Sequence, residues 1–249
     1  MSETACVAIR MRPGTITALP MRAAVLMALA MSSGFAAHAS DSFQLQCEHR
    51  LPAGELVFDY KPGEVSYDNS AGMLELTGKS GSMKRNRVTL GTTDFELAYT
   101  AHVSTRPLKE GRTGKACGRM LGWVELQLAP HRISVAKELP AGSCAYAHVA
   151  EHEMKHVAIN ERHLQAVAAE MTARAARQVA RRTFIGSEAE LRSQMAKYVT
   201  NSWIPEVKAA MNKVAAQHDK LDTPEEYARN ETVCGGAIVP IAREALARD

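Results

Sequence analysis

The feature that most constrains the fold of this 249-residue chain is a segment, 145–182, that contains neither Pro nor Gly. Ala, Glu, Arg and Gln dominate it, and these residues are strong helix formers. Apolar residues recur on one face at helical spacing, which predicts a stripe that packs against a core: Val157, Leu164, Ala168, Met171 and Ala175. We therefore expect one long helix, and the rest of the chain must cover its stripe.

Near its start this helix carries the pattern His-Glu-x-x-His, at His152, Glu153 and His156. Residues four apart on a helix lie about 40° apart and one turn along, so both imidazoles can reach one metal ion. Glu153 points in a neighbouring direction, where its carboxylate can accept a proton from a water on the metal. Zinc is the default ion for two neutral imidazoles, a further ligand and an open position. The motif predicts a zinc hydrolase; a helix with two surface histidines is the alternative.

The other histidines of this helix, His148 and His163, are not predicted to share the ion. His163 lies about 10 Å from His156 at a rise of 1.5 Å per residue, and a single ion cannot take ligands from three successive turns. The third ligand should therefore come from elsewhere in the fold.

The C-terminal part of the chain continues in helices. A second helical segment, 188–217, is expected to run antiparallel to the first, with a kink at Pro205. Residues 222–226 are typical of a loop that leads into a short capped helix, and 240–248 of a last helical piece.

This antiparallel arrangement suggests where the third ligand lies. The level of residues 152–156 on the first helix is met near residues 214–218 on the second. His218 is our first choice for the ligand and Asp219 our second, whereas Glu206 falls about 12–15 Å too far along the helix.

Residues 40–140 are typical of a strand-rich half. Short apolar or alternating runs are separated by Gly, Pro and Asn turns, and six of them are predicted to be strands: 43–47, 56–58, 73–76, 95–103, 123–128 and 132–136. The basic stretch 84–87 is predicted to be a solvated hairpin tip. The expected fold class is α+β, with a strand-rich half followed by the helical half, 141–249.

The first 39 residues are typical of an export leader. Arg22 is followed by an apolar run, 23–30, and then by Ala37-His38-Ala39, which matches an A-x-A cleavage signal. The apolar run is too short to span a bilayer, so we expect cleavage after Ala39 and a periplasmic or secreted protein with no membrane span. The mature chain, 40–249, would have 210 residues and form a single domain.

The charge of the mature chain is close to balanced. Without the leader it has 27 basic and 26 acidic residues, so nothing suggests nucleic acid as a partner. A peptide or protein substrate is the expected partner of the predicted site.

Four cysteines remain in the mature chain, and in an oxidising compartment they suggest two disulfides. Three connectivities are possible, of which we favour Cys117–Cys144 with Cys47–Cys234. One or more free buried thiols are the alternative. A cysteine-rich zinc site is not expected, because the chain has no C-x-x-C pair.

Ser143-Cys144, followed by the run from His152 to Ile159 after a strand-rich, Cys-bearing half, resembles a zincin-type metallopeptidase. More narrowly, it is similar to bacterial secreted zinc-dependent proteases in which the motif continues into a long Ala-rich helix. The resemblance covers about residues 121–222. It implies His152 and His156 as zinc ligands and Glu153 as general base.

The chain departs from one branch of that family, since a metzincin would have Gly at 159 and His at 162, where this chain has Ile159 and Arg162. The expected activity is metallopeptidase hydrolysis of peptide bonds. Tyr146, Tyr227 and His163 are candidates for a donor to the developing oxyanion. The alternatives are an exported binding protein with a structural or vestigial zinc site, and an interaction module without metal.

Overall fold

The computed structural model describes residues 36–80, 88–111 and 113–247. The predicted leader lies outside them up to residue 35, as does the basic stretch 84–87. Strands are concentrated in the N-terminal half and helices in the C-terminal half, so the predicted α+β class is confirmed. That residues 40–249 form one domain stays a prediction.

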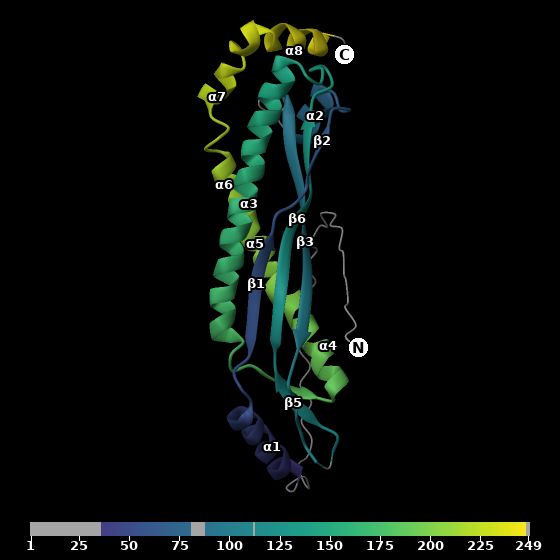
Figure 1. Ribbon diagram of the computed structural model, residues 1–249, viewed down its shortest axis with the longest axis vertical. Coiled ribbons are helices and arrows are strands. Elements are labelled where there is room, and N and C mark those ends of the chain that lie inside the picture. The colour runs from purple at the N-terminus through teal and green to yellow at the C-terminus, as the bar shows by residue number, and fades with distance from the viewer. Residues whose placement is uncertain (1–35, 81–87, 112, 248–249) are drawn as a thin grey trace, which may run out of the picture.

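The sheet is built around one long strand, β6 (Leu121–Val135). β1 (Glu55–Lys61) and β2 (Val65–Asp68) follow one another along one edge of β6, both parallel to it. β3 (Gly91–Ser104) runs antiparallel along the other edge. At about 3.3 Å per residue the 15 residues of β6 span about 50 Å, which gives the molecule its elongated shape (Figure 1).

Helix α3 (Cys144–Gln178) lies along one face of this sheet (Figure 1). It begins where predicted, because the Ser143 hydroxyl accepts a hydrogen bond from the Tyr146 N–H and caps it. The five residues of the predicted stripe are all buried, and most of them pack against sheet residues such as Leu126 and Leu128. The alternation predicted for 123–128 is also confirmed, since Val124, Leu126 and Leu128 are buried.

The chain then returns in the opposite direction, first against β3 and then along α3 (Figure 1). The returning segment comprises α4 (Glu188–Tyr198), the π-helical turn η2 (Val199–Trp203), α5 (Ile204–Met211), the 3-10 turn η3 (Asn212–Val214) and α6 (Ala215–His218). The α-helical pattern is interrupted directly before Pro205, where the sequence predicted a kink. Proline has no N–H, and its ring displaces the carbonyl four residues earlier, so a wider turn fits there.

Two of the predicted strands are wrong. Residues 43–47 belong to helix α1 (Ala36–Arg50), and residues 73–76 to helix α2 (Met73–Ser80). In α1 the buried residues Phe43 and Cys47, and Leu51 directly after the helix, are spaced four apart, while Leu45, which alternation had placed on the same face, is 54% exposed. A run of five residues is too short to separate helical from strand periodicity.

The predicted disulfide pairing is also wrong. The structure joins Cys47 to Cys117 and Cys144 to Cys234. Cys117 lies on β5 (Ala116–Arg119), just before β6, and Cys144 lies just after β6. These two cysteines are therefore at opposite ends of a strand about 50 Å long and cannot meet.

Each cysteine pairs with the partner at its own end of the molecule. At one end α1 packs on β5, and the Arg119 guanidinium donates to the backbone oxygens of Glu48 and Leu51. β5 also joins a small sheet with β4 (Leu108–Lys109) and β7 (Thr183–Gly186). At the other end lie α7 (Pro224–Arg229), the 3-10 turn η4 (Val233–Gly236) and α8 (Ile238–Ala247).

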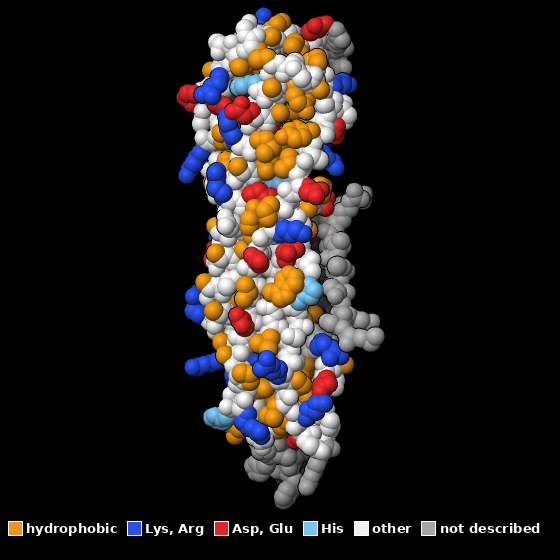
Figure 2. All heavy atoms as spheres, viewed as in Figure 1, with side chains coloured by type: hydrophobic (Ala, Val, Ile, Leu, Met, Phe, Trp, Pro, Cys, Tyr) orange, Lys and Arg blue, Asp and Glu red, His pale blue; other side chains and the backbone are white. Residues whose placement is uncertain are grey.

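Hydrophobic side chains and charges of both signs are interspersed along the face seen in Figure 2. Among the described residues, none of the helices is long and apolar enough to cross a membrane.

Candidate metal centre

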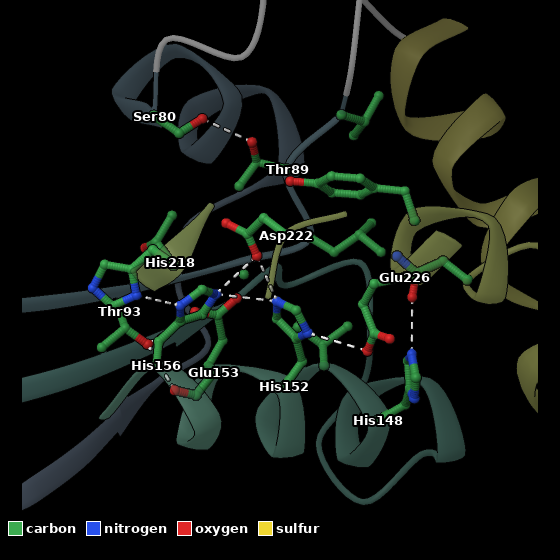
Figure 3. A pocket seen from close by; sticks show the side chains of 17 residues that line it. Ser80, Thr89, Thr93, His148, His152, Glu153, His156, His218, Asp222 and Glu226 are labelled. Carbon is green, nitrogen blue, oxygen red and sulfur yellow. Dashed lines mark hydrogen bonds and ion pairs between the residues drawn. The ribbon is translucent and has the colours of Figure 1, made fainter. Parts of the chain in front are cut away.

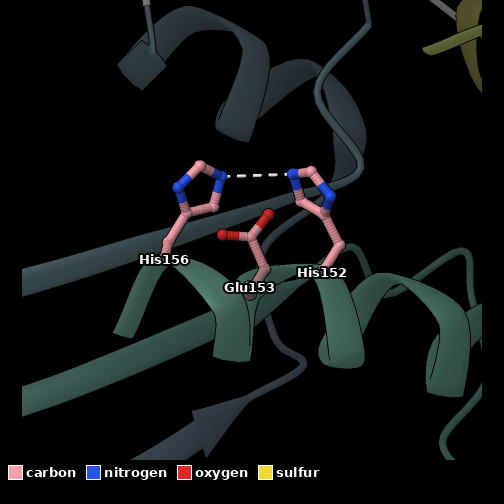
Figure 4. Close-up of side chains that lie close together, drawn as sticks. All are labelled: His152, Glu153 and His156. Atoms are coloured by element: carbon pink, nitrogen blue, oxygen red, sulfur yellow. Dashed lines mark hydrogen bonds between the residues drawn. The ribbon is translucent and has the colours of Figure 1, made fainter. Parts of the chain in front are cut away.

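The three motif residues project from one side of α3, as Figure 4 shows. The Nε2 atoms of His152 and His156 are 3.1 Å apart. Ligand atoms of His152, Glu153 and His156 all lie within 4.8 Å of one another, so this group could hold a metal ion. The two imidazoles therefore converge as the helical spacing predicted.

A carboxylate from a distant part of the chain completes the cluster. Asp222 lies in the loop between α6 and α7, and its Oδ1 is 3.1 Å from His152 Nε2 and 3.0 Å from His156 Nε2 (Figure 3). The Asp222 N–H donates to the His218 carbonyl, so Asp222 follows one turn after the end of α6. Three potential ligand atoms thus form a nearly equilateral triangle.

The predicted ligand His218 lies beside this triangle rather than in it. Its Nδ1 is 2.8 Å from Nδ1 of His156, and its Nε2 is 2.9 Å from Oδ1 of the buried Asn160. The antiparallel arrangement had correctly placed residue 218 level with the motif. The ring nitrogen it presents, however, contacts the outward nitrogen of His156.

His152 is held from behind by a second carboxylate. Its Nδ1 lies 3.4 Å from Oε1 of Glu226, on α7. Because an ionised carboxylate only accepts, this Nδ1 carries the proton, and Nε2 of the neutral ring presents a lone pair to the triangle. Metal-binding histidines are commonly oriented by such an outer carboxylate.

A second proton on His152, at Nε2, can be donated to Asp222, and this hydrogen bond raises the pKa of His152 above its usual value, an effect that burial opposes. Burial would raise the pKa of Asp222, but His152 and His156, which can donate to this carboxylate when protonated at Nε2, outweigh it and hold that pKa far below its usual range. Both shifts have the same origin, since a carboxylate facing two imidazoles favours positive charge between them.

Glu153 is only 6% exposed and is held by the first residues of β3. The Thr93 hydroxyl lies 2.9 Å from Glu153 Oε2, to which it donates. Gly91 is needed for this approach, because a Cβ there would lie 2.6 Å from Val149 Cγ1 and 3.0 Å from Glu153 Cγ. Burial raises the pKa of Glu153, and the neighbouring His156 and Thr93 oppose this shift.

The cluster opens into a cavity of about 290 Å³. Motif residues form one wall with Asp222 and His218 (Figure 3). The remainder combines hydroxyl groups with apolar side chains from α2, β3, α3 and α7 and their flanking segments, among them Ser80, Val88, Thr89, Leu90, Val149 and Tyr227. Of the three residues suggested as oxyanion donors, Tyr227 therefore lies at the cavity.

The other candidate residues have separate partners. His148 Nε2 lies 2.8 Å from Oδ1 of Asn230. His163 contacts the Ala210 carbonyl oxygen and the Gln217 side chain, at 3.0 Å each. Asp219 is exposed, and Glu206 forms an ion pair with Arg174.

Sequence reasoning missed Asp222, Glu226, Thr93 and Asn160. One signal for Asp222 was available, since it follows His218 by four residues and so lies on the same face one turn on. Asn160 likewise follows His156 by four residues. No local pattern could have indicated Thr93, which reaches Glu153 across 60 positions of the chain.

A second buried polar group lies behind the cluster. His131, on β6, is 0% exposed, and its Nδ1 is 3.2 Å from Oε1 of Glu161, which also accepts a hydrogen bond from the Gly63 N–H. Burial lowers the pKa of His131, and the Glu161 carboxylate opposes this. Burial, together with the same carboxylate, raises the pKa of Tyr60 to about 12.

Comparisons with protein-family models, curated proteins and solved structures found no match.

The lowered pKa of His131 predicts a pH-dependent stability. Below about pH 6.5, the usual pKa of histidine, the unfolded chain binds a proton at residue 131 that the folded chain resists, so the free energy of unfolding should fall. Urea unfolding with chelator present, at about pH 7.5 and about pH 5.5, measures this loss for the wild type and His131→Gln. The variant should lose less stability over the interval. Equal losses in the two proteins would assign the pH dependence to other groups.

Proposed function

We propose that this protein is a zinc-dependent metallopeptidase whose ligands are His152, His156 and Asp222. The observation that carries the proposal is the convergence of His152 Nε2, His156 Nε2 and Asp222 Oδ1, at mutual distances of 3.0–3.1 Å. With the proton of the neutral His152 ring on Nδ1, where Glu226 accepts it, the lone pairs of His152 Nε2 and Asp222 Oδ1 face one another. A cation between them relieves the repulsion.

The separations suit zinc. In a tetrahedral zinc site, bonds of about 2.0–2.1 Å place two ligand atoms about 3.3 Å apart. Two imidazoles and one carboxylate are a donor set that leaves the fourth position open, as hydrolytic sites require. Asp222 replaces His218 as our proposed third ligand, because His218 meets His156 at the outward nitrogen.

Zinc bound there would supply a Lewis acid that lowers the pKa of water and stabilises charge on a carbonyl oxygen. Glu153 is the proposed general base, which accepts the proton of the attacking water and returns it to the leaving amine. Its burial and raised pKa suit both steps, since a weakly basic carboxylate would hold the proton too briefly. Thr93 keeps the carboxylate oriented into the cavity.

A peptide is the proposed substrate because an extended backbone segment borders the centre. Gly91, Thr92 and Thr93 open strand β3 and line the cavity. In the described part of the chain β3 pairs with β6 alone, so its other edge can offer N–H and C=O groups to an extended peptide.

Export is the second part of the proposal. Two disulfides fit an oxidising compartment outside the cytoplasm, and the leader features of the first 39 residues support secretion or delivery to the periplasm.

The ligand assignment predicts a specific pattern of zinc loss. Substituting Ala for His152, His156 or Asp222 should weaken zinc binding by more than about 100-fold, beyond what loss of an outer-shell group causes. His148→Ala and Asp219→Ala are matched controls and should bind like the wild type. Competition with a chromophoric chelator measures the affinities. Retention of wild-type affinity by Asp222→Ala would remove Asp222 from the ligand set.

Glu153→Gln should keep the zinc and the fold but lower kcat/KM by about 10²–10⁴-fold, because an amide cannot accept the proton. Cleavage of a peptide library, with metal content measured on the same samples, tests this. Glu151→Gln, an exposed position two residues earlier on α3, is the control.

Two outcomes would contradict the peptidase proposal. Full activity of Glu153→Gln would refute the mechanism. A zinc-loaded wild type that cleaves no peptide of a broad library would favour an exported binding protein with a structural zinc site.

The export proposal predicts the mass of the mature protein. Protein recovered from an exporting host should begin at Ser40 and weigh four hydrogens less than its reduced form, because both disulfides are closed. Free thiols on all four cysteines, or an intact leader, would contradict it.

A further inference from the structure

A line of polar contacts runs from the metal centre into the protein interior. His156 Nδ1 contacts His218 Nδ1 at 2.8 Å, and His218 Nε2 contacts Asn160 Oδ1 at 2.9 Å. Asn160 Nδ2 lies 3.5 Å from His131 Nε2, and His131 Nδ1 lies 3.2 Å from Glu161 Oε1. Two further histidines and an amide thus connect the proposed zinc ligand His156 with a carboxylate.

The carboxylate sets the direction of every hydrogen bond in this line. Glu161 can only accept, so His131 donates from Nδ1, and Nε2 of the neutral ring must accept. Asn160 therefore turns its N–H₂ group toward His131 and its oxygen toward His218.

The same logic continues to the metal centre. His218 must donate from Nε2 to the Asn160 oxygen, which leaves its Nδ1 as an acceptor. His156 then donates from Nδ1, and its Nε2 lone pair is the one that faces His152 and Asp222.

We propose that Glu161, His131, Asn160 and His218 form a relay that fixes the tautomer and orientation of His156 for metal binding. The relay rests on the proposed metal site and assigns it four positioning residues. None of them contacts the metal.

Burial fixes the hydrogen-bond partners within the relay. His131 is 0% and Asn160 1% exposed, so neither can exchange its partner for bulk water. The ring of His131 is also held by Phe95, edge-on at 5.7 Å between ring centroids. A reversed amide at Asn160 would place two donors against each other at His218 and two acceptors at His131, and the protein interior penalises both.

The relay makes the two histidine ligands equivalent in one respect. His152 has a carboxylate directly behind it, Glu226, and His156 has one at the far end of the relay. An anionic acceptor behind a ligating imidazole raises its basicity and fixes its ring.

The first test reads the tautomers in the folded wild-type protein without metal. Long-range ¹H–¹⁵N correlation spectra distinguish the protonated ring nitrogen of each histidine. We expect the proton of His131 on Nδ1 and that of His218 on Nε2. The opposite tautomer at either residue would overturn the relay.

The second test uses two variants of Asn160 that both remove its donor to His131. Asn160→Leu also removes the acceptor for His218 and should weaken zinc binding by about 10-fold or more, as loss of an outer-shell group does. Asn160→Asp keeps an acceptor and should stay within about 3-fold of the wild type. His163→Ala, three residues further along α3 and outside the relay, is the control.

His218→Ala separates a positioning residue from a ligand. It should still bind one zinc, with an affinity lower by about 10–100-fold, whereas His156→Ala should lose the site. Equal loss in these two variants would make His218 a ligand, and equal loss in both Asn160 variants would refute the relay. A wild type that takes up no zinc would refute the proposed metal site, and the tautomers would then decide the relay alone.

Discussion

The structure depends on the contact between the apolar stripe of α3 and one face of the sheet. The helix has 35 residues and extends over about 52 Å, close to the length of β6. Because the stripe is buried from Val157 to Ala175, the position of α3 along the strands of the sheet is fixed. In this position Glu153 lies at the start of β3, where Gly91 permits the close approach and Thr93 holds the carboxylate.

At the candidate metal centre, atoms with unshared electron pairs are held close together. His152, His156 and Asp222 present their ligand atoms to a common position, where without a positive charge they would repel one another. Surrounding groups maintain this arrangement, namely Glu226 behind His152 and His218 behind His156. This preorganisation favours cation binding, because folding already supplies the free energy that holds the three ligand atoms close together.

Local periodicity accounts for the sequence predictions that were confirmed. The helix 144–178, its buried stripe and the convergence of His152 and His156 all follow from 3.6 residues per turn, a regularity that needs no information from elsewhere in the chain. The antiparallel return of the second helical segment brought residue 218 level with the motif for a similar reason. The same reasoning failed at 43–47, where five residues fitted either periodicity and packing against Cys117 selected the helix.

The sequence by itself determined the long helix, the pair of imidazoles and the α+β class, because each depends on spacing within one segment. Only the tertiary structure decided which carboxylate faces those imidazoles, which cysteines pair and which residue orients Glu153. These depend on where separate segments meet. Asp222 reaches the centre because the chain turns after α6, and Cys117 cannot reach Cys144 because β6 separates them by its full length. Such meetings are set by the lengths and packing of whole elements, which no local pattern records.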